Sequence, residues 1–432
     1  GLTTLELGGN TQTIKGFDLG TTIVVADATD AAGGGATTTL KVTPADATGT
    51  ADTLKLEVKA GEAESQTVEV KDVETLSITL DDTDTGYDTQ TFVLTKFEGT
   101  TVNATQKTDD TTSSNIALGT LHKNVTDVDT TGIKGTQAFS LASGTAAATV
   151  KLAGTGTATV TGSAKADTFT IAKTSTDINH SITGEAGTDS VTMTVTDGWS
   201  NPSSLNVESV TLDVVAGDND VNLAGNNFHA TATAITLKGG NSLSSFKTTT
   251  TPLLATVKTF DASNFAGDLI LGVATDNFDD TLTITGGVST KDSVANTINS
   301  GTDKPKTTGI ETFKITTDVT NTGTATLDLS NTTGLKTVEA TIGANDTLVI
   351  DKATDQVAKV KGVTTAGTVE YKLADATGSS DAATFELDGT IVDGAKLKTT
   401  DIETVTVKIS TNPEDMDLSD LSMTTAGATM KL

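Results

Sequence analysis

The residues best suited to do chemistry in this chain are the glycines and aspartate of one short motif. It reads G-x-x-G-x-D-x-V and is complete at Gly184, Gly187, Asp189 and Val191. Glycine tolerates positive φ, so a backbone with this spacing can curl and aim several carbonyl oxygens inward. Asp189 adds a charged oxygen, and Val191 points into the core. Because Ca²⁺ takes six to eight oxygen ligands, stacked turns of this kind predict a calcium site.

Incomplete copies of the motif recur along the chain and extend the set of candidate ligands. Lys165 replaces the second glycine before Asp167, and the turns at Asp52 and Asp381 keep only the first glycine. In these copies the competing interpretation is an aspartate that caps its own turn through side-chain hydrogen bonds. The candidate metal-binding residues are Gly184, Gly187, Asp189, Gly162, Asp167, Asp292, Asp346, Asp52 and Asp381.

A longer repeated unit must position these turns. In four places a Gly/Asp turn and its strand are followed by a glutamate that opens a second strand. The interval from turn aspartate to glutamate is 22 residues in two copies and 19 in the other two. We predict a structural role for these glutamates. The four pairs are Asp52 with Glu74, Asp189 with Glu208, Asp292 with Glu311, and Asp381 with Glu403.

Two neighbouring turns share a register that indicates how the chain winds. Residues 160–171 align with residues 182–193 at a constant offset of 22, which places Asp167 on Asp189. This offset fits one coil of a β-solenoid, in which each rung stacks on the last. The two aspartates would then lie on neighbouring turns, close enough to share a cation. Two consecutive hairpins with similar turns are the alternative.

Composition supports an all-β chain. Aromatic residues make up only 3% of the sequence, whereas Thr, Val and Gly are abundant, which favours pleated strands and turns. We predict β-solenoid or parallel β-helix-like rungs with β-sandwich-like modules and little or no helix. Three regions are expected. They are an N-terminal β module with the first repeat unit (1–120), a β-solenoid-like region of Gly/Asp turns (121–255) and a C-terminal β repeat region (256–432).

Two polar segments interrupt this strand pattern. Residues 106–120 contain few apolar side chains, and residues 300–308 read SGTDKPKTT. We predict a linker for the first segment and an exposed loop for the second.

Charge excludes some partners. The formal net charge is −28, from 56 acidic and 28 basic residues, and none of the basic residues is Arg. Without the guanidinium fork, the chain is a poor candidate for binding nucleic acid. Such negative charge repels itself unless it is hydrated or neutralised by cations. Solubility alone is the alternative reason for it. No apolar run approaches the roughly 18 residues of a membrane span, so we expect no membrane-spanning segment.

Catalysis has little support. The three histidines, His122, His180 and His229, lack metal-ligand spacing, there is no Cys, and no G-x-S-x-G motif occurs. Acidic pairs are frequent enough to hide a glycosidase dyad, although sugar sites usually add aromatic platforms. We therefore expect no enzyme, with a carbohydrate-active β-helix enzyme as the alternative.

Three phrases between the turns carry a resemblance to a known family. They are NVESVTL at residues 206–212, FDASNFAGDLIL at residues 260–271 and GLKTVEAT at residues 334–341. With the four repeat units, they resemble the lattice-forming region of RTX-type bacterial surface-layer proteins over most of residues 45–410. The resemblance implies type I secretion without a cleaved N-terminal signal and Ca²⁺-dependent folding outside the cell. It also implies self-assembly into a two-dimensional layer at the cell surface, with a cell-surface polysaccharide or an anchoring protein as a further partner.

Two other extracellular functions stay open. A secreted RTX-like, calcium-dependent adhesin would bind a surface as a monomer. A haloarchaeal-type surface protein is suggested by the acidity and by the glycosylation sequons at Asn103 and Asn124.

Overall fold

The structure is a computed structural model, and it describes most of the chain. The described residues are 3–7, 11–25, 37–45, 48–60, 65–82, 89–107, 113–172, 180–196, 204–215, 220–222, 231–248, 252–318, 323–363, 366–391, 395–410, 421–423 and 429–431. They contain 40 strands and two short 3-10 helices. The chain divides into two compact units, one built from residues 1–213 and 225–232 and the other from residues 214–224 and 233–432.

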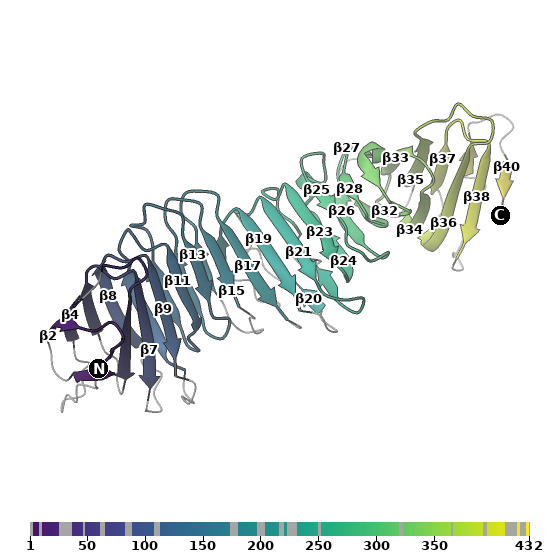
Figure 1. Cartoon of the computed structure of the whole chain (residues 1–432). Coiled ribbons are helices and arrows are strands. Elements are labelled where there is room, and N and C mark those ends of the chain that lie inside the picture. Colours follow the sequence, from purple (N-terminus) through teal and green to yellow (C-terminus); the bar gives the residue numbers. More distant parts are fainter. Residues whose placement is uncertain are drawn as a thin grey trace. The chain divides into compact units, whose positions relative to one another are not determined.

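Unit 1 winds as a β-solenoid in which successive strands alternate between two parallel sheets. Figure 1 shows these strands stacked in chain order, from purple to teal. The first sheet, sheet A, contains β1 (Thr4–Leu7), β3 (Thr22–Val25), β5 (Thr53–Ala60), β7 (Thr75–Asp82), β9 (Thr101–Gln106), β11 (Asp127–Gly132), β13 (Thr149–Leu152), β15 (Thr168–Ile171), β17 (Ser190–Val195) and β19 (Ser209–Val214). The second, sheet B, contains β2 (Thr11–Phe17), β4 (Thr37–Pro44), β6 (Ser65–Val70), β8 (Thr89–Phe97), β10 (Asn115–Thr120), β12 (Gln137–Ser140), β14 (Ala158–Thr161), β16 (Ser181–Thr183) and β18 (Ser204–Asn206).

Unit 2 is also solenoidal, with a changing cross-section. Three runs of parallel strands build it, and both 3-10 helices, η1 (Thr275–Asn277) and η2 (Leu329–Asn331), belong to it. One run contains β21 (Ala234–Gly239), β23 (Thr259–Phe265), β25 (Thr283–Thr285), β28 (Lys306–Thr308) and β31 (Thr332–Thr333). A second contains β20 (Asp220–Asn222), β22 (Ser245–Lys247), β24 (Asp268–Gly272), β26 (Ser293–Ile298), β29 (Thr312–Thr317), β32 (Thr337–Ile342), β34 (Val357–Val363), β36 (Ala382–Ile391), β38 (Thr404–Ile409) and β40 (Thr429–Lys431). The third contains β27 (Gly301–Asp303), β30 (Thr324–Asp328), β33 (Thr347–Ala353), β35 (Thr368–Leu373), β37 (Lys396–Thr399) and β39 (Leu421–Met423).

Apolar and polar side chains alternate along these strands. In β17, Val191, Met193 and Val195 are buried while the intervening Ser and Thr side chains face outward. A strand points successive side chains to opposite faces, so this alternation gives every coil one apolar inner side and one polar outer side. The prediction of an all-β, solenoidal fold with little helix is confirmed.

The predicted 22-residue coil is also confirmed. Val160 pairs with Ile182 between β14 and β16, and Phe169 pairs with Val191 between β15 and β17. Both pairings are parallel, which excludes the alternative of two antiparallel hairpins. The equivalent residues of the two turns therefore stack on adjacent rungs.

The two predictions of irregular segments are wrong where the structure describes them. Residues 115–120 of the expected linker form β10, and residues 301–303 and 306–308 of the expected loop form β27 and β28. Residues 108–112 lie outside the described part of the chain. Stacking on neighbouring coils supplies backbone hydrogen bonds to these polar segments whatever their intrinsic propensity.

No helix in the described part of the chain combines the length and the apolar character needed to cross a membrane.

Candidate cation site at the Gly/Asp turns

The complete Gly/Asp motif forms the turn between β16 and β17. Gly187 has φ of +140° and Glu185 has φ of +73°, so the chain curls back sharply before Asp189. A Cβ on Gly184 would lie 2.2 Å from Oδ2 of Asp189. A Cβ on Gly187 would lie 2.6 Å from the backbone carbon and oxygen of Lys165 on the preceding coil. The first glycine therefore makes room for the aspartate, and the second lets adjacent coils stack closely.

The carboxylate of Asp189 links its own coil to the preceding one. Its Oδ1 accepts the backbone N–H of Asp167 at 2.7 Å. The Asp167 carboxylate in turn accepts the N–H of Ala148 at 2.7 Å, and the N–H of Asp189 donates to Oε2 of Glu208 at 2.8 Å. We call this run of contacts, through Ala148, Asp167, Asp189 and Glu208, the carboxylate ladder. It holds each turn in register with the next.

The same link recurs in the other three repeat units. In each one, the motif glutamate accepts the backbone N–H of the turn aspartate on the preceding coil through Oε2. The distances are 2.8 Å from Asp52 to Glu74, 3.1 Å from Asp292 to Glu311 and 2.9 Å from Asp381 to Glu403. The predicted structural role of the glutamates is therefore confirmed, and the interval of 19 or 22 residues is the length of a coil at these positions.

Several turn carboxylates also cap their own turns, which was the competing interpretation. Asp52 accepts the N–H of Gly49 at 3.2 Å, and Asp292 accepts that of Gly287 at 2.6 Å. Asp346 instead accepts the hydroxyl of Thr317, at the end of β29 and outside its own turn, at 2.9 Å. At each of these positions at least one carboxylate oxygen that a cation would need already holds a hydrogen bond of the protein.

Asp189 and Asp381 differ from Asp52, Asp167 and Asp292. Among the described residues, Oδ2 of each is buried and has no hydrogen-bond partner. Asp189 is only 1% exposed, and this burial, followed by the charges of Asp167 and Glu208, raises the pKa of its carboxyl against the opposing hydrogen bond from Asp167. An uncompensated buried carboxylate oxygen is costly, so a proton or a cation would relieve this site.

The predicted ligands are gathered only in part. Gly162, Asp167, Gly184, Gly187 and Asp189 lie together on two adjacent turns. The remaining candidates stand at the starts of four separate strands, with Asp52 before β5, Asp292 before β26, Asp346 before β33 and Asp381 before β36.

These turns offer Ca²⁺ few side-chain ligands. No group of three or more His, Cys, Asp or Glu side chains within the described ranges could hold a metal ion. Since Ca²⁺ takes six to eight oxygens, carbonyls or water would have to supply most ligands at Asp189 or Asp381. The residues therefore fit a cation at one carboxylate oxygen per turn, rather than in a cage of carboxylates.

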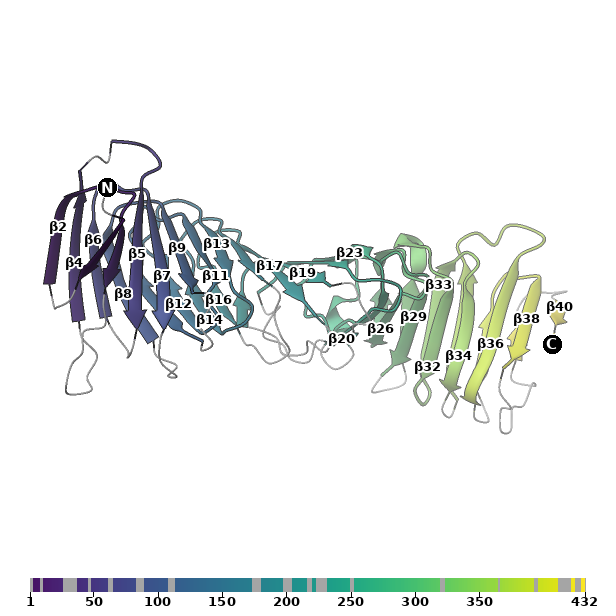
Figure 2. The same ribbon diagram turned by 60° about the horizontal axis from the view of Figure 1, so that its bottom comes forward.

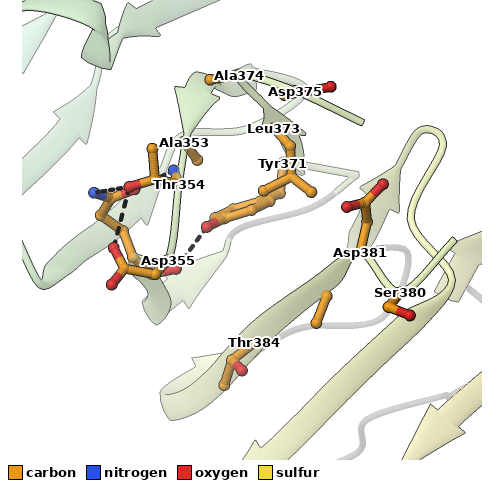
Figure 3. A pocket seen from close by; sticks show the side chains of 12 residues that line it. Ala353, Thr354, Asp355, Tyr371, Leu373, Ala374, Asp375, Ser380, Asp381 and Thr384 are labelled. Carbon is orange, nitrogen blue, oxygen red and sulfur yellow. Dashed lines mark hydrogen bonds between the residues drawn. The ribbon is translucent and has the colours of Figure 1, made fainter. Parts of the chain in front are cut away.

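Asp381 faces a larger space. It lines a pocket of roughly 530 Å³ together with Tyr371, Asp355 and Asp375. Figure 3 shows Asp381 and Tyr371 on opposite sides of this pocket, with the Tyr371 hydroxyl turned away to donate to the carbonyl of Gln356 at 2.7 Å. Burial raises the pKa of Tyr371 above its ordinary value. The tyrosine hydroxyl is therefore held as a structural donor.

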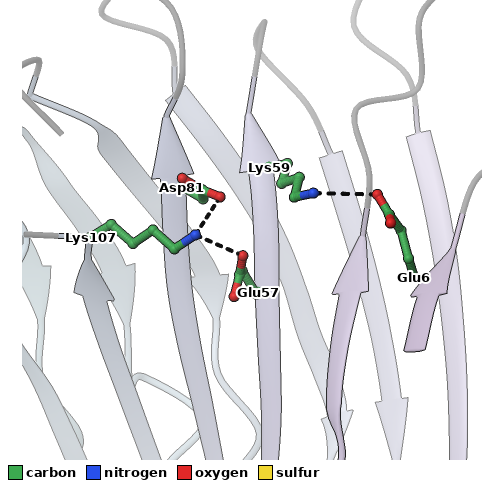
Figure 4. Close-up of polar contacts among 5 residues, drawn as sticks. All are labelled: Glu6, Glu57, Lys59, Asp81 and Lys107. Atoms are coloured by element: carbon green, nitrogen blue, oxygen red, sulfur yellow. Dashed lines mark hydrogen bonds and ion pairs between the residues drawn. The ribbon is translucent and has the colours of Figure 1, made fainter. Parts of the chain in front are cut away.

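Sequence reasoning missed the ion pairs that tie coils together on the outer faces. Lys107 Nζ contacts Oδ2 of Asp81 at 2.6 Å and Oε1 of Glu57 at 3.0 Å (Figure 4). These two contacts raise the pKa of Lys107. In the sequence, Lys107 lies one coil after Asp81 and two coils after Glu57. This spacing could be recognised only if the coil lengths were already known.

The histidines take local structural roles where they are described. His180 is buried and accepts the N–H of Ala158 through Nδ1 at 3.3 Å, and burial lowers its pKa to about 4. His122 accepts the N–H of Asn124 at 3.4 Å. His229 lies outside the described residues.

Comparison with known proteins identified no relative. No family model matches the chain, and neither a curated protein nor a solved structure matches it at a significant level. The β-solenoid class therefore stands on the geometry of the chain itself.

Proposed function

We propose that this chain is an extracellular structural protein that assembles with copies of itself into a surface layer, and that Ca²⁺ neutralises its buried turn carboxylates. The observation that supports the structural role is the carboxylate ladder. The acidic side chains most suited to chemistry, such as Asp167 and Glu208, accept backbone N–H groups of the adjoining coil. Their hydrogen bonds hold the solenoid in register, as a stiff building element requires.

The role of Ca²⁺ is supported by charge. A chain with a net charge of −28 repels both itself and its copies, and divalent cations reduce that repulsion. We place the cation at Asp189, because this residue combines a buried, unpartnered Oδ2 with the complete Gly/Asp motif.

Assembly is tested by imaging the purified chain in Ca²⁺ and after chelation with EDTA. We expect ordered sheets in Ca²⁺ by negative-stain electron microscopy, and their dissolution together with a lower melting temperature in EDTA. A chain that stays monomeric in Ca²⁺ would contradict self-assembly and favour the adhesin. Unchanged melting and particle size in EDTA would contradict the role of Ca²⁺.

The site of the cation is tested by calorimetric titration of Ca²⁺ into variants. Asp189→Asn keeps an acceptor for the N–H of Asp167 but removes the charge, so we expect weaker binding and a smaller rise in melting temperature. Asp52→Asn is the matched control, because the Asp52 carboxylate already caps Gly49. Equal effects of the two substitutions would rule out a preferred site at Asp189.

A further inference from the structure

The outward positions of four described strands in sheet B carry no charge. In β12, β14, β16 and β18, the apolar side chains are buried and the alternating side chains face outward. We call these outward positions the hydroxyl face, because six of the eight carry a hydroxyl. They are Ala138, Ser140, Thr159, Thr161, Ser181, Thr183, Ser204 and Asn206.

The hydroxyl face is also regular. The pairings of β12 with β14, β14 with β16 and β16 with β18 are in continuous register, and Figure 2 shows β12, β14 and β16 side by side. By contrast, the register shifts between Ala117 and Gly119 where β10 meets β12. Strands without bulges align their side chains in straight rows about 4.8 Å apart. A flat surface of short side chains allows another flat surface to approach closely.

The rest of the same sheet shows what the hydroxyl face lacks. Earlier in sheet B, Glu69 contacts Lys96 at 2.6 Å and Lys41 at 3.3 Å, so charges stand in a ladder on the outer face. Any approach of a second copy there must desolvate these ions. For a chain of charge −28, an uncharged face is where like copies meet at the lowest electrostatic cost.

Part of the opposite side of these coils also carries no charge. Between Lys151 on β13 and Asp213 on β19, the outward side chains of sheet A are hydroxyls. They are Thr168, Thr170, Ser190, Thr192, Thr194, Ser209 and Thr211. Two uncharged sides that face away from each other allow head-to-tail contacts. Such heterologous contacts continue into rows, because each copy keeps one side free for the next.

Hydroxyl chemistry suits this pairing. Each Ser or Thr hydroxyl both donates and accepts hydrogen bonds, so two hydroxyl-lined surfaces match without opposite charges. We propose that the hydroxyl face docks a second copy of this chain, against the uncharged outward positions of sheet A between Lys151 and Asp213. This inference rests on the proposed function, since it names the contact through which self-assembly proceeds.

A single charge at the centre of the face tests the contact. Ser181 is exposed on β16 and lies between its paired residues on the neighbouring strands, Thr159 on β14 and Ser204 on β18. In Ca²⁺, we expect Ser181→Asp to weaken association at least about tenfold by sedimentation velocity, because the contact would then bury an unpaired carboxylate against uncharged hydroxyls. Ser204→Asp on the same row is a second test. Ser65→Asp is the matched control, on the charged part of the same sheet face.

Circular dichroism and melting temperature establish that each variant is folded. If the folded Ser181→Asp and Ser204→Asp variants both associate as strongly as the wild type, this contact is overturned while the proposed function stays intact. Equal weakening by Ser65→Asp would also overturn it, since the effect would then be one of net charge. A wild-type chain that does not associate in Ca²⁺ would overturn the proposed function and this contact with it.

Discussion

The turns at Asp189 and Asp52 share a motif but differ in surroundings. Both aspartates donate a backbone N–H to the glutamate of the next coil. Asp189 is buried among neighbouring turns and keeps one oxygen without a partner, whereas Asp52 is half-buried and caps Gly49. The backbone link is thus the constant function of the motif. Whether a turn carboxylate also keeps a buried oxygen without a hydrogen-bond partner depends on how deeply the neighbouring coils bury it.

The largest expected effect comes from filling the space beside the buried carboxylate. Gly184→Ala places a Cβ 2.2 Å from Oδ2 of Asp189, and this buried carboxylate has no room to move away. We expect a loss of about 3 kcal/mol in the free energy of unfolding of unit 1. Gly49→Ala, whose Cβ would lie 2.8 Å from an Asp52 oxygen in an exposed turn, should cost about 1 kcal/mol or less. Urea denaturation measures both, and equal losses would remove the distinction between the turns.

Acidity should reveal the effect of burial at Asp292, whose carboxylate is fully buried although it caps its own turn. Burial raises the pKa of Asp292 to about 6, with Glu311 and Asp268 adding to the effect against hydrogen bonds from Leu269 and Gly287. A carboxyl whose pKa is higher in the folded than in the unfolded state stabilises the fold below the unfolded pKa, and this stabilisation is lost as pH rises through about 6. We expect the chain to be about 2 kcal/mol more stable near pH ~4.5 than near pH ~7.5.

Asp292→Asn separates this titration from the general relief of charge repulsion at low pH. Asn keeps one of the two acceptor oxygens and cannot ionise, so the variant should melt at a lower temperature but with less dependence on pH than the wild type. An unchanged pH profile in the variant would show that Asp292 is not responsible.

The backbone link itself should have a smaller effect. Glu208→Ala removes the acceptor of the Asp189 N–H and leaves that donor in a buried turn, which should cost about 1.5 kcal/mol. Glu208→Gln keeps a neutral acceptor and should recover part of the loss. If Glu74→Ala costs as much as Glu208→Ala, the link has the same strength at both turns, and burial matters only for the carboxylate.

The smallest expected effect is at the surface. Lys107 is one-third exposed where it contacts Asp81 and Glu57, so solvent screens the contacts that Figure 4 shows. We expect Lys107→Met to cost about 0.5 kcal/mol, and less in high salt. A loss as large as that from Gly184→Ala would mean that outer ion pairs, rather than the turns, hold the coils together.

Sequence alone determined the strands and the coil of the central region. Alternation of apolar and polar residues is a local property, and the offset between Gly162 and Gly184 reports the coil length directly, so both were predictable. The polar segments 106–120 and 300–308 were mispredicted because their strands depend on the coils beside them.

Only the tertiary structure decided which groups meet. The spacing from Asp189 to Glu208 was visible, but the hydrogen bond from the Asp189 N–H to Glu208 exists because the coils stack in one register. Stacking also determined which turn carboxylates were buried and which kept a free oxygen. Burial and hydrogen bonding depend on the residues above and below each coil, and a pattern within one coil does not contain them.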